Sequence, residues 1–162
     1  MTPTTAMELE IPTDRPVITW RRFVKASPEV LWEAFTRCEH LSNWWGPANL
    51  TMVQCDVDVR PGGAWRHVVR APDGSEIGFH GEYRVVDRPR TLSNTFVFDP
   101  VPDHYAVDTI TFEPQDGGTL IVGHSEHDTI EARDAHVAGG MESGMRESFD
   151  RLAALAEQLQ AR

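Results

Sequence analysis

The sequence predicts a single α+β domain in which a curved antiparallel sheet of about seven strands packs around a long C-terminal helix, with an interior cavity between them. Three observations predict this fold class. Residues 49–127 consist of strand-like runs of about six to ten residues, separated by turn signals. Residues 129–162 lack proline and repeat apolar side chains every three or four positions, which is typical of an amphipathic helix. One strand-like segment and two short helical patterns precede both regions.

The N-terminal residues divide into a tail and a first strand. Residues 1–14 include Pro3 and Pro12 and lack the basic start and apolar core of a secretory signal, so we expect a flexible tail. Arg15–Lys25 is rich in β-branched and aromatic residues that alternate in direction, which favours a strand. We therefore assign residues 15–162 to one domain, a length that suits a single hydrophobic core.

Two short helices are expected after this strand. Ser27 can cap the first helix, Pro28 suits its first position, and Glu29 favours the positive end of its dipole. The second helix covers Cys38–Trp45 and ends at Gly46, which is followed by a proline.

Turn signals punctuate the meander that follows. The two glycine pairs among them lie at expected strand turns, and neither resembles a phosphate-binding loop that opens a helix. The breaks are Pro61–Gly63, Pro72–Gly74, Asp87–Arg90, Asp99–Asp103 and Asp116–Gly118.

The last segment, from about Glu131 to Gln160, predicts one long helix whose inner face changes along its length. Met141 and Met145, with a glycine between them, lie near its start, whereas Leu152–Leu159 lies near its end. Methionine adapts to irregular apolar space. We therefore expect the cavity near the two methionines, under Trp44-Trp45, and solid core at the leucine end.

The charge balance disfavours two classes of partner. The 15 Lys and Arg residues are outnumbered by 25 Asp and Glu residues, which gives a formal net charge of −10. Nucleic acids and anionic membrane surfaces both require concentrated positive charge. No apolar run approaches the roughly 20 residues that span a bilayer. We therefore expect neither a nucleic-acid partner nor a membrane partner.

Cysteine and histidine spacing gives no metal motif. Cys38 and Cys55 form no CxxC pair, and we expect two reduced, buried thiols in a cytoplasmic protein. His124 and His127 would face opposite sides of a strand, and His136 lies nearby only in sequence. We expect no metal and no cofactor.

The final hairpin contains the candidate catalytic residues, Asp108 and His124. A three-residue loop at Gln115–Gly117 would place these side chains opposite each other, where a carboxylate beside an imidazole could position a proton. A two-residue Asp116-Gly117 turn would pair Asp108 with Ser125 instead, because one residue of slip changes every partner. A surface location without a role is the third alternative.

Aromatic and methionine side chains are candidates for the walls of the cavity. The consecutive rings of Trp44 and Trp45 point in different directions, so at most one lies deep in the core; they form a lid over the interior, or one of them stacks on a ligand. Met141 and Met145 either fill the core or form an adaptable wall. The candidate ligand-binding residues are Trp44, Trp45, Tyr83, Phe96, Phe98, Asp108, His124, Met141 and Met145.

Short sequence segments also occur in a characteristic order along residues 17–160. They are Ala26–Trp32, Trp44–Pro47, Arg60–Gly63, Pro72–Gly74, Gly81–Tyr83 and Gly140–Leu152. This ordered set resembles the START-like, or SRPBCC, superfamily, and within it the bacterial relatives of the C-terminal domain of the Hsp-ninety ATPase activator. The resemblance implies a helix-grip fold with a hydrophobic cavity. It implies little about chemistry, because the superfamily includes lipid carriers, hormone receptors, aromatic cyclases and co-chaperone domains.

Three functional hypotheses follow from the sequence. The first is binding of a small hydrophobic molecule, with Asp108, His124 and Tyr83 as its polar contacts. The second is an enzyme of cyclase or dehydratase type that uses acid–base residues of the same cavity; covalent catalysis is poorly supported because no G-x-S-x-G segment occurs. The third, by family analogy alone, is a co-chaperone-like interaction module. A homodimer is compatible with a domain of this size, although no interface signature is visible.

Overall fold

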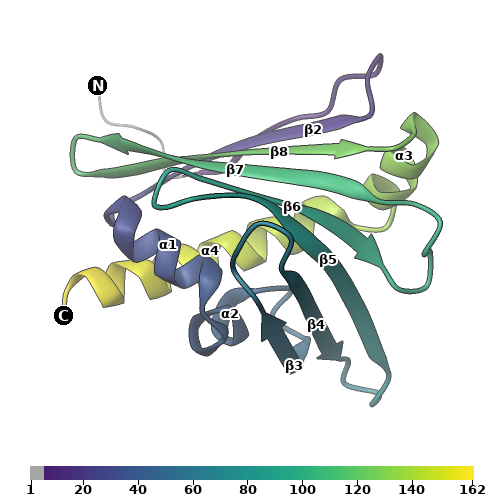
Figure 1. Ribbon diagram of the computed structural model, residues 1–162, viewed down its shortest axis with the longest axis horizontal. Helices are drawn as coiled ribbons and strands as arrows, with labels where there is room; N and C mark the ends of the chain where they lie inside the picture. Colours follow the sequence, from purple (N-terminus) through teal and green to yellow (C-terminus); the bar gives the residue numbers. More distant parts are fainter. Residues whose placement is uncertain (1–5) are drawn as a thin grey trace.

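The computed structural model describes residues 6–162, which form eight strands and four helices. Neighbouring strands all pair antiparallel, in the order β1-β2-β8-β7-β6-β5-β4-β3. Helices α1, α2 and α4 lie along the same side of this sheet (Figure 1). The elements are β1 (Glu8–Glu10), β2 (Val17–Val24), α1 (Pro28–Thr36), α2 (Cys38–Trp44), β3 (Thr51–Val57), β4 (Ala64–Arg70), β5 (Glu76–Asp87), β6 (Thr91–Phe98), β7 (Ala106–Gln115), β8 (Gly118–His127), α3 (Ile130–Ala138) and α4 (Met141–Gln160).

The face of the sheet that packs on the helices is called the inner face below. Trp20 of β2 stacks on Phe149 of α4 with ring centroids 4.2 Å apart, and Phe112 of β7 meets Phe35 of α1 at 5.3 Å. Gly123 lies opposite Trp20 on β8, and a side chain there would collide with the Trp20 indole. A glycine at this position of β8 thus leaves room for the indole of Trp20.

The predicted short helices are present, and a side-chain cap explains the start of α1. Ser27 Oγ accepts a hydrogen bond from the backbone N–H of Val30 at 3.2 Å, with Pro28 in the first turn of α1. α2 ends in Trp44, whose indole N–H donates to the carbonyl of Ala34 at 2.9 Å. This bond ties the two helices together in the core.

The predicted strand breaks also hold. The five turn signals separate β3 from β4, β4 from β5, β5 from β6, β6 from β7 and β7 from β8, in that order. The local turn chemistry therefore sets the lengths of the strands.

The single long helix predicted for residues 131–160 is two helices, α3 and α4. Gly139 and Gly140 separate them, and Gly140 has a φ of +91°, a left-handed conformation that ends the helical path. The buried guanidinium of Arg133 in α3 donates to the backbone carbonyls of Arg15 and Val17, which fixes α3 to the start of β2. No helix among residues 6–162 is both long and apolar enough to cross a membrane.

Part of the predicted tail is a strand. Residues 8–10 form β1 and pair with β2, with Glu8 opposite Arg21 and Glu10 opposite Thr19. Met7, just before β1, is buried. The expectation of a flexible tail is therefore wrong for this stretch, because three residues are enough to extend a sheet edge but too few to show a strand pattern. The earlier part of the tail, with Pro3, lies outside the described residues.

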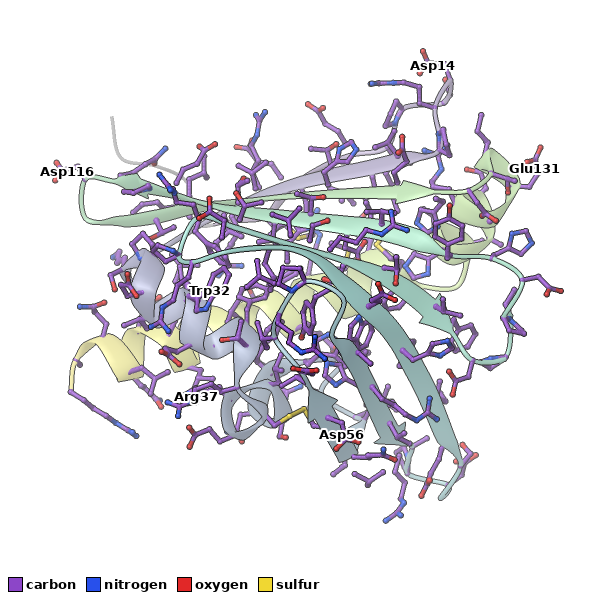
Figure 2. The ribbon with its side chains drawn as sticks, viewed as in Figure 1. Asp14, Trp32, Arg37, Asp56, Asp116 and Glu131 are labelled. Atoms are coloured by element: carbon purple, nitrogen blue, oxygen red, sulfur yellow. A yellow bond between two sulfur atoms is a disulfide. The ribbon has the colours of Figure 1, made fainter. Side chains whose placement is uncertain are left out.

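The two cysteines form a disulfide, so the prediction of two reduced thiols is wrong. Cys38, at the start of α2, is joined to Cys55 of β3, and their Cα atoms are 5.8 Å apart (Figure 2). The pairing depends on α2 packing beside β3, which a spacing of 17 residues does not reveal. Disulfides are typical of oxidising compartments. The cytoplasmic location stays a prediction.

We expect the disulfide to stabilise the fold by joining β3, an edge strand of the sheet, to α2. The double variant Cys38→Ser/Cys55→Ser should unfold with a free energy lower by about 3 kcal/mol, the value expected for a closed loop of this size. Urea denaturation measures it. Dithiothreitol should lower the free energy of unfolding of the wild-type protein to that of the variant and leave that of the variant unchanged. Equal stability of oxidised wild type and variant would contradict a structural role for the bond.

Candidate functional site

A row of polar side chains crosses the inner face at mid-sheet. Tyr83 of β5 lies opposite Asn94 of β6, Asn94 opposite Asp108 of β7, and Asp108 opposite Ser125 of β8. Ile18 of β2 completes the row beside Ser125. Directly opposite residues in antiparallel strands have neighbouring side chains. The four polar residues are therefore brought together in a face that is otherwise mostly apolar; they are called the polar row below.

Asp108 is the only acidic member of the polar row. Its carboxyl accepts a hydrogen bond from the hydroxyl of Ser125. The residue as a whole is half-buried, but protein surrounds the carboxyl deeply enough that burial raises its pKa to about 6, against a smaller lowering by Ser125. Asp108 thus changes protonation state near neutral pH, which few carboxyl groups do.

Two uncharged histidines adjoin the polar row. His127, two residues after Ser125 on the inner face, lies opposite Ala106, and its ring is 5.4 Å from that of His136 in α3. Burial lowers the pKa of His127 to about 4, and it also lowers the pKa of His136, although the latter keeps an exposed surface. The Nε2 atom of His127 is buried without a hydrogen-bond partner among the described residues.

Aromatic rings lead from the polar row toward α2. Phe96 is two residues from Asn94 on the inner face of β6, and its ring centroid is 5.5 Å from Phe79 of β5. Phe79 in turn is 5.1 Å from Trp45, which follows α2. Phe96 is also 6.3 Å from His136. Trp45, Phe79 and Phe96 are called the aromatic strip below, and all three are only half-buried.

His67 lies beside the aromatic strip and is also uncharged. Its ring is 4.8 Å from both Trp45 and Trp65, and its Nδ1 is 3.1 Å from the carbonyl oxygen of Arg66. Burial lowers its pKa to about 4. The aromatic strip is thus flanked by a neutral imidazole and not by a cation.

The two consecutive tryptophans have different environments, as their spacing predicted. Trp44 is 2% exposed and packs between Phe35 and Phe149, so it is core. Trp45 is half-buried and reaches the inner face at the aromatic strip. Trp44 is therefore a core residue and not a member of the aromatic strip.

The other predicted ligand-binding residues also differ in how deeply they are buried. Tyr83 is buried within the polar row, and burial raises the pKa of its hydroxyl to about 12. Met141 is buried, Met145 is half-buried against the core, and Phe98 is exposed at the end of β6 beside Phe79. A role in ligand binding stays a prediction for each of them.

Of the alternatives left open by the sequence, the pair of Asp108 and His124 does not form. The β7–β8 turn has two residues, with Gln115 opposite Gly118, and Asp108 therefore pairs with Ser125. His124 pairs with Thr109 and is exposed on the outer face. The shorter of the two weighed turns is the correct one, and the catalytic version of the Asp108–His124 pair is wrong.

Several residues of the site were not predicted from the sequence, among them Asn94, His67, Phe79, His127 and His136. Alternation with Phe96 places Asn94 on the inner face, and this signal was available in the sequence. From the sequence, His127 and His136 were considered only as metal ligands, and their spacing did not suit a metal site. Among residues 6–162, no group of three or more His, Cys, Asp or Glu side chains could hold a metal ion.

Two surface hollows among the described residues are lined by other residues than the polar row. One is lined by the disulfide and by residues 36–39 and 55–58. The other lies beside Arg66, Gly78 and Asp99. The cavity predicted between the sheet and the C-terminal helix stays a prediction.

Comparisons with known proteins confirm the predicted helix-grip fold. Residues 25–157 match the sequence model of the family described as Activator of Hsp90 ATPase homolog 1-like protein, and no curated protein matches. A crystal structure of a protein from Rhodobacter sphaeroides is 28% identical, with a TM-score of 0.85 over 92% of this chain and 97% of that chain. A crystal structure from Chromobacterium violaceum is also 28% identical, with a TM-score of 0.75 over 87% and 97%. The solution structure of the AHSA1-like protein from Aeromonas hydrophila, at 21% identity, shows the fold alone, with a TM-score of 0.71 over 88% and 93%.

The raised pKa of Asp108 predicts a pH-dependent effect of Asp108→Asn. A carboxyl whose pKa is raised by folding favours the folded state when protonated, and this stability is lost as the pH rises through about 6. At pH 7 the variant should therefore be more stable than wild type by on the order of 2 kcal/mol, with little difference at pH 4. Urea denaturation at both pH values measures this, with Asp116→Asn in the exposed turn as the matched control. A difference that is the same at both pH values would contradict the buried carboxyl.

Proposed function

The chain belongs to the family of Activator of Hsp90 ATPase homolog 1-like proteins, whose START-like fold suits a ligand-binding or interaction domain, and we propose that it binds a small hydrophobic molecule between the inner face and α4. The observation that carries the proposal is the polar row. Among the described residues, the Nε2 atom of His127 has no hydrogen-bond partner and no cation pairs with Asp108. Both point to a ligand, because buried polar groups are normally hydrogen-bonded and buried charges are normally paired.

The apolar surface around the polar row supports the same proposal. Phe96 and Ile110 follow Asn94 and Asp108 by two residues on the inner face, and Met145 comes from α4. These three side chains pack on the core yet remain half-buried, as do Trp45 and Phe79. Ligand sites commonly combine such apolar walls with a few convergent polar groups.

Acid–base catalysis at the same row is the second candidate function. A carboxyl with a pKa of about 6 can both donate and accept a proton near neutral pH. In this version Asp108 is the catalytic group and Ser125 orients it, in place of the predicted His124. Turnover of a bound ligand that disappears in Asp108→Asn, while ligand affinity persists, would favour an enzyme over a binding protein.

A chaperone interaction is the alternative suggested by the family description, which names an activator of an Hsp90 ATPase. We place it behind ligand binding because the half-buried polar row carries the ligand proposal, whereas the family description alone suggests the chaperone interaction. A chaperone partner and a homodimer both remain predictions.

We expect 1-naphthaleneethanol, an uncharged fluorescent probe with one hydroxyl, to bind to the inner face. Phe96→Ala should weaken its binding about tenfold, because the variant removes a ring from the aromatic strip. His124→Ala, on the outer face, is the control and should bind as wild type does. Fluorescence titration of folded variants provides the dissociation constants. If Phe96→Ala bound the probe with wild-type affinity, the inner face would be excluded as the binding site.

A further inference from the structure

Asp108 is a buried carboxyl without a cationic partner. Among residues 6–162, the hydroxyl of Ser125 is the one hydrogen-bond donor to it, and no Lys or Arg forms an ion pair with it. Other acidic groups of the chain differ. Asp99 binds Arg66 at 2.8 Å and His80 at 2.7 Å, and these neighbours lower its pKa.

The groups that face Asp108 from neighbouring elements supply no positive charge. Tyr83 of β5 and Asn94 of β6 are uncharged, and the Tyr83 pKa is raised to about 12. His127 of β8 and His136 of α3 have lowered pKa values and are neutral at neutral pH.

Arg22 and Arg133, which also lie on this side of the sheet, are engaged elsewhere. Arg22 of β2 pairs with Asp150 of α4 at 2.5 Å. Arg133 of α3 donates to three backbone carbonyls, those of Pro12, Arg15 and Val17, and pairs with Asp134. Within the described chain, Asp108 therefore has only neutral neighbours to compensate its charge.

This charge arrangement discriminates between ligand classes. Ionised Asp108 would repel a carboxylate or phosphate, and burying two like charges together is strongly unfavourable. It accepts hydrogen bonds from a neutral hydroxyl. A cation gives the largest gain, because a buried charge is stabilised chiefly by an opposite charge. The net charge of −10 also attracts cations to the protein.

We propose that the polar row binds a hydrophobic amine, with the ammonium group of the ligand paired to Asp108 and its apolar body on the aromatic strip. The inference rests on the proposed function and names its ligand class. The faces of Phe96, Phe79 and Trp45 suit this chemistry, because aromatic rings attract organic cations as well as apolar groups. The unpartnered Nε2 atom of His127 accepts a further N–H of the ammonium in its neutral form.

The test compares three probes that share one ring and differ in charge. They are 2-(1-naphthyl)ethylamine, 1-naphthaleneethanol and 1-naphthylacetic acid, titrated at pH 8 against the full chain. The amine should bind about tenfold more tightly than the alcohol, and the acid about tenfold more weakly. Asp108→Asn, which keeps the shape of the side chain, should remove the advantage of the amine, so that amine and alcohol bind within about twofold of each other. His124→Ala is again the matched control and should leave all three affinities unchanged.

The pH dependence provides a second readout. As the pH falls from 8 to 5, Asp108 takes up a proton and the ammonium loses its partner, so amine affinity should fall about tenfold. The alcohol should change little, and Asp108→Asn should abolish the dependence for the amine.

The possible outcomes separate the two proposals. Equal binding of amine and alcohol, or an amine preference that survives Asp108→Asn, overturns the amine inference and leaves the proposed function standing. Binding of none of the three probes overturns both. Tightest binding of the acid contradicts the charge assignment of the polar row.

Discussion

The register of the β7–β8 hairpin decides which side chains face the helices. Asp116 and Gly117 form the turn, and the φ of +84° at Gly117 suits the tight two-residue connection. This turn places Asp108 opposite Ser125 on the inner face and leaves His124 outside. Because side chains alternate along a strand, a shift of one residue would exchange the two faces of β8 relative to β7. The polar row exists only in the register that this turn imposes.

The apolar core beside the polar row has fully buried side chains at one end and half-buried side chains at the other. Leu31, Leu152 and Ala156 are fully buried where α1 and α4 meet, whereas Phe96 and Met145 keep accessible surface. The well-packed end provides the stability that a marginally stable domain needs to tolerate a buried carboxyl. A site of this kind is expected where the local rules of a stable core are broken, because such departures concentrate at functional positions.

Local signals predicted most of the fold, and long-range contacts account for the errors. The start of α1 after Ser27 and the positions of the strand breaks follow from residues adjacent in sequence. The structure confirms both. The disulfide of Cys38 and the short strand β1 depend on neighbours distant in the chain. The division between α3 and α4 was readable from Gly139-Gly140, but the apolar repeat that continues across the pair suggested one helix. For the site, Asp108 and Tyr83 were predicted. The inner-face position of Asn94 was readable from its alternation with Phe96, but its place opposite Asp108 needed the sheet register.

The central claim is that a small molecule binds between the inner face and α4, at the polar row. Intermolecular nuclear Overhauser effects between unlabelled 1-naphthaleneethanol and isotope-labelled protein test it most directly, because they report which protein protons lie close to the probe. The account predicts contacts from the naphthalene ring to Phe96, Ile110 and Met145, which come from β6, β7 and α4. Contacts confined to outer-face side chains such as Val107 would contradict it.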